Sequence, residues 1–283
     1  MAEYTKNLWG RWNKATLLVR LVVINCAVLL VGRIGGLILS WSLGTSDFII
    51  FEWLVLPGNL ESFLTRPWTL LTYMFTQEDI IHLLLNMLWL YGFGTIFLLF
   101  DSSRHLQGLY LLGGIVGGCF FFFTALSGVF PPGAVLLGSS GAVVAIVVGV
   151  AVLNPDFPIR LFLLGMVKLK WIAIVSVILF AMGLTGNNAG GHLAHLGGAL
   201  TGLVYGLKMR RGTDITRPVN MILDKLANAI DYNKFKLNKR RSSKRNDKKK
   251  DDKRMEEILA KLRSSGYNSL TPEEKALLFR RSR

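Results

Sequence analysis

Long apolar runs constrain this chain more than any other feature of its sequence. Several of them reach the length of about 18 residues at which an apolar stretch predicts a helix that crosses a membrane. Six runs occur, at residues 15–40, 80–100, 106–126, 139–153, 169–184 and 191–207. The fourth and sixth runs are short for a bilayer core of about 30 Å, so we expect them to lie inside a bundle whose neighbouring helices cover their ends. The sequence therefore predicts an all-α integral membrane protein with six transmembrane helices.

Charge is distributed unevenly along the 283 residues. Residues 208–283 hold 23 Lys or Arg and 10 Asp or Glu, and so carry most of the formal net charge of +15. Lys and Arg also precede the first run and lie between the fourth and fifth runs, whereas the connection between the first two runs is mainly acidic. Since basic loops favour the cytoplasmic side, six spans place all basic segments on one side. We therefore expect both termini to lie in the cytoplasm.

The ends of the chain differ from the apolar part. We divide the sequence into four parts. A cytoplasmic segment covers residues 1–14, and a six-helix domain covers residues 15–208. A basic and largely disordered linker with one amphipathic helix follows at 209–254, and a small helix-turn-helix module at 255–283. In the last module, Thr271-Pro272-Glu273-Glu274 has the pattern of a helix N-cap and capping box. The following helix would carry Leu277, Leu278 and Phe279. The polar run at 238–254 should contact anionic lipid or only enforce topology. Nucleic acid is a poor partner because no aromatic residues alternate with the charges.

The connection between the first two runs, residues 41–79, is rich in aromatic residues mixed with charges. Such segments favour the membrane interface. We expect it to be partly helical and to lie in the outer leaflet.

Three groups of polar or small residues inside the apolar runs are candidates for chemistry. His82 and Asn86 share one face of the second predicted helix, where they would serve either as an interhelical hydrogen-bond clamp or as a functional pair. Gly138-Ser139-Ser140-Gly141 opens the fourth helix, where small residues permit close packing. At this position Ser140 would also lie beside unpaired backbone N–H groups that can stabilise an oxyanion.

The third group is His195 in the sixth run, one turn before the Gly198-x-x-x-Gly202 face. That face lets another helix pack at short range. If the helix that packs on this face is the fourth, His195 lies next to Ser140. A base beside a serine is the minimum for an activated nucleophile. The fourth to sixth runs hold no acidic residue, so the pairing would be a dyad. His192 and His82 could add metal ligands, but no carboxylate completes a zinc set, and we predict no metal and no cofactor.

Together these groups resemble the rhomboid family of intramembrane serine proteases. The matching motifs occur in the family order on the second, fourth and sixth runs, and residues 67–75 and 110–114 resemble the family too. The resemblance implies that Ser140 is the nucleophile and His195 its general base. It also implies that His82, Asn86 and the Ser140 N–H form the oxyanion hole, while Gly138, Gly141, Gly198 and Gly202 allow helix packing. The substrate would be the transmembrane segment of a single-pass protein, cut near the outer face.

Three positions depart from the pattern that many rhomboids share. Thr69 replaces an Arg after Trp68, Gln77 replaces a His, and Val144 replaces a Tyr one turn after the nucleophile. The first two concern support of the 41–79 connection, and the third removes a ring that would stack on His195. A non-catalytic, rhomboid-like binder of membrane helices is the alternative function. A transporter is a more distant alternative, because its inverted repeats are not found.

Overall fold

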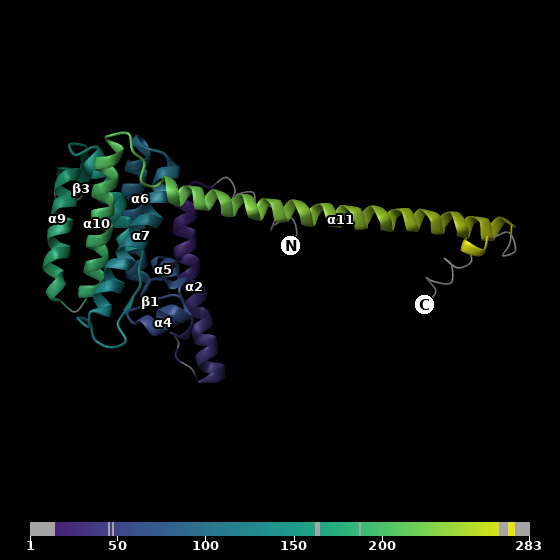
Figure 1. The fold of residues 1–283 in the computed structure, drawn as a ribbon, viewed down its shortest axis with the longest axis horizontal. Coiled ribbons are helices and arrows are strands. Elements are labelled where there is room, and N and C mark those ends of the chain that lie inside the picture. Colours follow the sequence, from purple (N-terminus) through teal and green to yellow (C-terminus); the bar gives the residue numbers. More distant parts are fainter. Residues whose placement is uncertain are drawn as a thin grey trace. The chain divides into compact units, whose positions relative to one another are not determined.

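The structure, a computed structural model, describes residues 15–44, 46, 48–161, 165–186, 188–265 and 271–274. The predicted cytoplasmic segment 1–14 lies outside them. A helical bundle follows the six apolar runs in order (Figure 1). Its long elements are α2 (Leu17–Leu43), α6 (Ile80–Phe100), α7 (Ser103–Leu126), α8 (Ser140–Leu153), α9 (Leu169–Met182, continued by the 3-10 turn η2, Gly183–Thr185) and α10 (Ala189–Met209).

Within the described residues, three of these helices are long and apolar enough to cross a membrane: α2, α6 and α7. The helices α8 and α9 are shorter and also apolar. The helix α10 has 21 residues, but its glycines and histidines lower its hydropathy. The chain is therefore a mostly helical membrane protein, and six spans remain the prediction.

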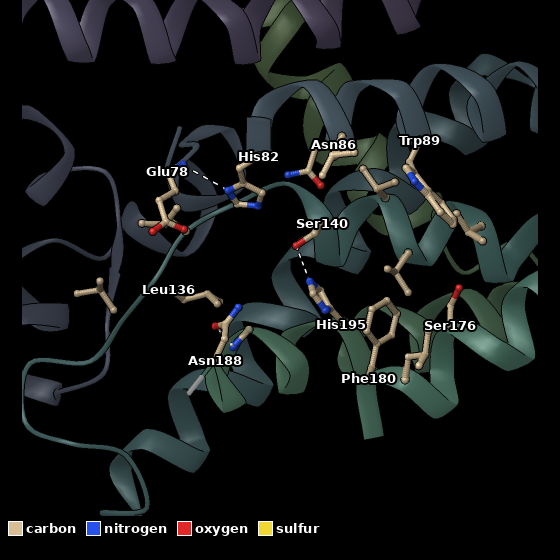
Figure 2. A pocket seen from close by; sticks show the side chains of 18 residues that line it. Glu78, His82, Asn86, Trp89, Leu136, Ser140, Ser176, Phe180, Asn188 and His195 are labelled. Carbon is tan, nitrogen blue, oxygen red and sulfur yellow. Dashed lines mark hydrogen bonds between the residues drawn. The ribbon is translucent and has the colours of Figure 1, made fainter. Parts of the chain in front are cut away.

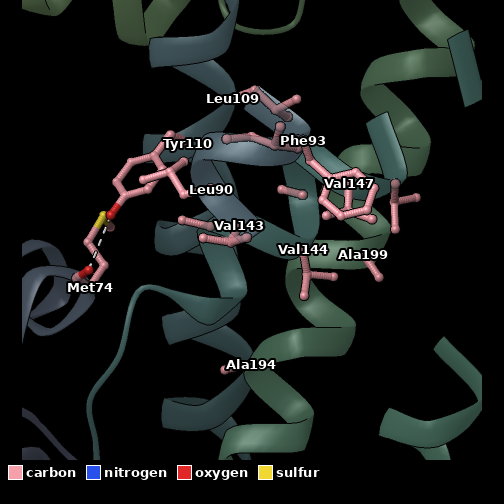
Figure 3. Packing of buried hydrophobic residues seen from close by; sticks show 14 of the residues in the cluster. Met74, Leu90, Phe93, Leu109, Tyr110, Val143, Val144, Val147, Ala194 and Ala199 are labelled. Carbon is pink, nitrogen blue, oxygen red and sulfur yellow. Dashed lines mark hydrogen bonds between the residues drawn. The ribbon is translucent and has the colours of Figure 1, made fainter. Parts of the chain in front are cut away.

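The shortest apolar run forms the centre of the bundle. The helix α8 packs against α6, α7, α9 and α10, and every residue from 141 to 151 is buried. Branched and small side chains such as Val147 on α8 and Ala199 on α10 fill this interface (Figure 3). The outer helices instead expose large apolar side chains, among them Leu30, Ile34, Leu84, Leu88 and Ile178. This arrangement suits a bundle whose outer surface contacts lipid and whose centre contacts only protein.

The connection between α2 and α6 is partly helical, as the sequence predicts. It contains α3 (Ile49–Glu52), the strand β1 (Leu56–Pro57), α4 (Leu60–Thr65), α5 (Thr69–Thr72) and the 3-10 turn η1 (Tyr73–Phe75). The sequence did not predict that β1 pairs antiparallel with β2 (Val135–Leu136), which lies just before α8. Buried side chains of Phe51, Tyr73 and Met74 anchor the connection to the core. Gly138, directly before α8, donates its N–H to the carbonyl of Tyr73, so the connection helps to place the start of α8.

A two-stranded hairpin joins α8 to α9. Its strands β3 (Pro158–Leu161) and β4 (Gly165–Lys168) are antiparallel. Hydrogen bonds from Lys170 and Lys168 lower the pKa of the exposed Asp156 carboxyl. These basic residues lie in the connection that the charge pattern assigns to the cytoplasm.

The C-terminal boundary of the bundle lies further along the chain than residue 208, where the sequence analysis placed it. The first compact unit ends at Met221. The buried side chains of Thr216 and Asn220 contact the start of α7, where Asn220 donates to the carbonyl of Arg104 at 3.2 Å and Thr216 lies against Gly108. The Asp214 carboxylate accepts the Thr216 N–H at 2.7 Å. Residues 213–221 therefore belong to the bundle, a connection that apolar periodicity could not reveal because the contacts are polar.

The boundary can be tested by shortening the chain. A chain that ends after Met221 is expected to keep the melting temperature of the bundle in detergent. A chain that ends after Gly212 should lose about 1–3 kcal/mol of stability, because the hydrogen bond from Asn220 to the Arg104 carbonyl is lost and the hollow at Gly108 loses Thr216. Thermal unfolding of both chains in the same detergent measures the difference. Equal melting temperatures of the two shortened chains would mean that the bundle ends near residue 208, as the sequence predicts.

The second unit, residues 222–283, differs from its sequence prediction. One helix, α11 (Arg217–Ser265), begins at the end of the first unit and continues through residues 238–254, where the sequence predicts a disordered run. Residues 219–265 contain no Pro or Gly, and Lys and Arg have good helix propensity. The predicted capping box is confirmed, because Thr271 and Glu274 exchange two hydrogen bonds. The predicted helix with Leu277, Leu278 and Phe279 lies outside the described residues.

Candidate active site

The start of α8 places Ser140 at a helix N-terminus. Ser140 is the first residue of α8. Gly138, two residues earlier, has φ of +114°, which L side chains rarely adopt, and a Cβ there would lie 2.9 Å from the His82 ring. Glycine is therefore required both for the turn and for space. The first N–H groups of a helix lack partners within it, and the positive end of its dipole favours an anion.

Close packing of α10 on α8 brings His195 to Ser140. A Cβ on Gly198 would lie 2.0 Å from the Gly141 carbonyl oxygen, and one on Gly202 would lie 2.3 Å from that of Ala145. The predicted glycine face of α10 is thus the contact with α8. With the backbones this close, His195 Nε2 lies 2.6 Å from Ser140 Oγ (Figure 2). That distance lies within the range expected for a nucleophile and its base.

In Figure 2, His82 and Asn86 lie on the side of Ser140 opposite to His195. They occupy the first turns of α6, which begins after Asp79, whose carboxylate accepts the His82 N–H at 2.8 Å. The Glu78 N–H donates to His82 Nδ1 at 3.3 Å. That contact favours the neutral tautomer that carries its proton on Nε2. His82 can then donate a hydrogen bond from Nε2.

All four residues line one cavity of about 840 Å³. Its polar part includes Ser140, His195, His82 and Asn86. Apolar side chains from α6, α8 and α9 also line it, among them Trp89, Val143, Val147, Leu179 and Phe180. A cavity with a few convergent polar groups and an apolar extension can orient one peptide bond while it holds an apolar side chain beside it.

His195 has no acidic partner among the residues that the structure describes. Among the residues that the structure describes, none accepts a hydrogen bond from His195 Nδ1, although this atom is buried. The ring of His192 lies 5.7 Å from that of His195, between centroids, and Nδ1 of His192 is likewise buried without a partner in the described part of the chain. The described residues contain no group of three or more potential metal ligands. Within the described residues, Ser140 Oγ is the hydrogen-bond partner of the His195 ring, through Nε2.

A comparison with known families identifies the fold around this pair. The family model described as Rhomboid domain matches residues 64–212, slightly more than half of the chain.

The chain belongs to the rhomboid family.

Two proteins with rhomboid names are similar in sequence to this chain. It is 30% identical over 190 residues to RHOMBOID-like protein 12, mitochondrial, of Arabidopsis thaliana, a match that covers 62% of this chain and 56% of that protein. It is 25% identical over 167 residues to Rhomboid protein 1, mitochondrial, of Saccharomyces cerevisiae, which covers 56% of this chain and 46% of that protein. The chain thus spans about half the length of each relative.

Aromatic contacts lie beside two of the three departures from the common rhomboid pattern. Beside Thr69, the rings of Trp53 and Trp68 stack at 6.4 Å, and Trp68 donates to the carbonyl of Trp53. Where Val144 supplies no ring, Phe180 of α9 packs on His195 with a centroid separation of 4.4 Å (Figure 2). No sequence pattern predicted a role for Phe180, because an aromatic residue in an apolar run is ordinary.

Removal of the Phe180 ring is expected to loosen the histidine of this rhomboid. Aromatic pairs contribute about 0.5–1.5 kcal/mol, so Phe180→Ala should lower kcat about twofold to tenfold. Steady-state cleavage of a membrane substrate in detergent measures this loss. The double variant Phe180→Ala, Val144→Phe offers a ring from α8 instead and should recover part of kcat. Unchanged kcat in Phe180→Ala would assign the ring to packing alone.

The third departure, Gln77, leads to a group that the sequence analysis missed. Gln77, Asn25 and Ser139 are fully buried polar residues joined by hydrogen bonds. A polar Asn25 inside the apolar run 15–40 was the available signal, because such residues are costly in a membrane unless they have partners.

Proposed function

We propose that this rhomboid is an intramembrane serine endopeptidase that cuts transmembrane segments of single-pass proteins near the outer face. The 2.6 Å contact between Ser140 Oγ and His195 Nε2, in a cavity that His82 and Asn86 also line, is the observation that supports it most directly. Family membership supports the same reaction class.

In the proposed reaction, Ser140 Oγ attacks the carbonyl carbon of the scissile bond while its proton passes to His195 Nε2. The carbonyl oxygen becomes an oxyanion that receives hydrogen bonds from His82 Nε2, Asn86 Nδ2 and the Ser140 backbone N–H. Collapse of this intermediate breaks the C–N bond, and the imidazolium gives its proton to the leaving amine. A water molecule, deprotonated by His195, then hydrolyses the acyl-enzyme and releases Ser140.

Among the described residues no carboxylate bonds to His195, and this affects how the barrier of the proposed reaction is lowered. In a triad, an acidic residue orients the histidine and stabilises its imidazolium. Here Phe180 packs on the ring, and no described residue accepts from Nδ1. We therefore assign to the oxyanion donors a larger share of transition-state stabilisation than in a triad protease.

The proposal includes a topology. Basic residues before α2, in the β3–β4 hairpin and after α10 favour one side of the membrane for all three segments. Ser140 starts α8 at the opposite, outer end, where water can reach the cavity. We propose a bacterial plasma membrane with both termini in the cytoplasm; the names of the two relatives place those proteins in mitochondria. The basic residues of the second unit would attract anionic lipid, at about 1 kcal/mol for each nearby charge.

Substrates can be sought directly in cells. Soluble fragments released by cells with the wild-type protein are compared by mass spectrometry with those from cells with Ser140→Ala. Fragments that appear only with the wild type and end near the outer edge of a predicted span would support the proposal. A set of released fragments that is identical in both strains would contradict it.

A further inference from the structure

A chain of buried side-chain amides runs from α2 to the candidate oxyanion hole. Asn86 Nδ2 donates to Gln77 Oε1 at 2.8 Å, and Gln77 Nε2 donates to Asn25 Oδ1 at 2.8 Å. Gln77 Nε2 also donates to Ser139 Oγ at 3.1 Å. Gln77, Asn25 and Ser139 are each 0% exposed, and Asn86 is 7% exposed. We call Asn25, Gln77 and Asn86 the amide relay.

The direction of the amide relay is fixed at its far end. Asn25 Nδ2 donates at 2.9 Å to the backbone carbonyl of Leu21, which can only accept. Asn25 therefore points its amide oxygen towards Gln77, and Gln77 must donate a hydrogen bond to this oxygen from its NH₂ group. The remaining oxygen of Gln77 then faces Asn86, which has to present its own NH₂ group. One carbonyl on α2 thus determines how the amide of Asn86 is turned.

The turn of this amide matters for the proposed chemistry. An Asn side chain can rotate by 180° and exchange its donor for its acceptor. With Nδ2 held by Gln77, the second N–H of Asn86 is available to the cavity that it lines with Ser140. In the flipped state, Asn86 would turn its carbonyl oxygen towards the developing oxyanion, and two partial negative charges would repel each other.

We propose that Gln77 is a positioning residue that holds Asn86 in its donor orientation. The inference rests on the proposed protease function. Gln77 is absent from the residues that line the cavity, so it acts through Asn86 and not on the substrate. Its burial supports the role, because an amide in an apolar core must have its hydrogen bonds made or it costs free energy.

The test is a double-mutant cycle between Gln77 and Asn86. Gln77→Met keeps the length of the side chain and removes both hydrogen-bonding groups, while Asn86→Ala removes the oxyanion donor. The matched control is Thr76→Val, the neighbouring residue, which is also 0% exposed and whose hydroxyl donates to the Thr72 carbonyl at 3.2 Å. The readouts are kcat, KM and melting temperature in detergent. The substrate is a single-pass membrane protein with Gly and Ala near the outer end of its helix.

Removal of one oxyanion donor typically costs about 10²–10³ in kcat, and Asn86→Ala should show this loss. Gln77→Met should lower kcat by at least about tenfold with KM nearly unchanged, because the defect concerns the transition state. The double variant should cleave no more slowly than Asn86→Ala, since Gln77 has nothing left to position. Thr76→Val should keep kcat near the wild-type value.

Several outcomes would overturn the inference and leave the protease proposal standing. One is that Gln77→Met has the same kcat as Thr76→Val. Another is that the fold-losses in kcat of Gln77→Met and Asn86→Ala multiply fully in the double variant. The third is that Asn86→Ala does not change kcat. If Gln77→Met does not fold, Gln77→Asn replaces it in the cycle. It keeps a buried amide but is too short to reach both Asn25 and Asn86, and the same outcomes apply. Cleavage by Ser140→Ala would instead overturn the proposed function.

Discussion

The Ser140→Ala variant is expected to show no detectable cleavage of a transmembrane substrate. Loss of a catalytic serine typically lowers kcat on the order of 10⁶-fold, because no other group can form the acyl-enzyme. The remaining contacts of the cavity are unchanged, so the variant should still bind the substrate and melt at the wild-type temperature. Gel analysis of substrate in proteoliposomes, with prolonged incubation, measures the loss. A fluorophosphonate probe should label the wild type and leave the variant unlabelled.

The neighbouring serine provides the matched control. Ser139 precedes Ser140 in the same Gly-Ser-Ser-Gly segment but is buried and accepts a hydrogen bond from Gln77, whereas the hydroxyl bonded to His195 is that of Ser140. Ser139→Ala should therefore retain measurable cleavage and phosphonate labelling. Loss of both in Ser139→Ala with retention in Ser140→Ala would reverse the assignment. Binding of membrane helices without cleavage by the wild type would favour the alternative of a non-catalytic rhomboid-like binder.

The Gly198→Ala variant is expected to lose both activity and stability. A Cβ at this position would lie 2.0 Å from the Gly141 carbonyl oxygen, and backbone cannot give way as a flexible side chain can. Overpacking of a well-packed core costs about 1–3 kcal/mol and occasionally more. Movement of α10 away from α8 would also separate His195 from Ser140, and a displacement of about 1 Å can cost about 10²-fold in rate. Melting temperature and cleavage rate in the same detergent test both effects.

Gly92 gives a control for the same chemical change. It also lies within a helix, α6, but a Cβ there would have nothing within 4 Å. Gly92→Ala should be neutral or slightly stabilising, since alanine has the higher helix propensity. Similar destabilisation by both changes would mean that the cost arises from the substitution itself and not from the contact between α8 and α10.

The positions of the helices and the proximity of Ser140 and His195 could be predicted from the sequence, each for a different reason. Apolar run length depends on the bilayer, so it predicted the six helical segments without knowledge of tertiary contacts. The glycines at 198 and 202 predicted close packing, and close packing placed His195 near another helix. The resemblance then assigned the partner. The match to the family over residues 64–212 confirms the membership that the motifs indicated.

The rest depended on contacts between distant residues. Phe180 is one apolar residue among many in its run, and only the packing of α9 brings its ring to His195. Gln77 was noted as a replacement, but its bonds to Asn25 and Asn86 connect residues up to 52 positions apart. The docking of Thr216 and Asn220 on α7 is polar, so it has no hydropathy signal. Hydrophobic periodicity can report which face of a helix is buried, but not which partner covers it.

The 14-residue length of α8 has a consequence for the products of the proposed reaction. At 1.5 Å per residue the helix spans roughly 21 Å, about 9 Å less than the hydrocarbon core of a bilayer. On the proposed topology Ser140 therefore cuts below the outer membrane boundary and not at it. The fragment that keeps the cytoplasmic part of the substrate helix is left too short for the bilayer. Such hydrophobic mismatch costs a fraction of a kcal/mol per Å, and this penalty disfavours the cleaved helix in the membrane relative to the intact one.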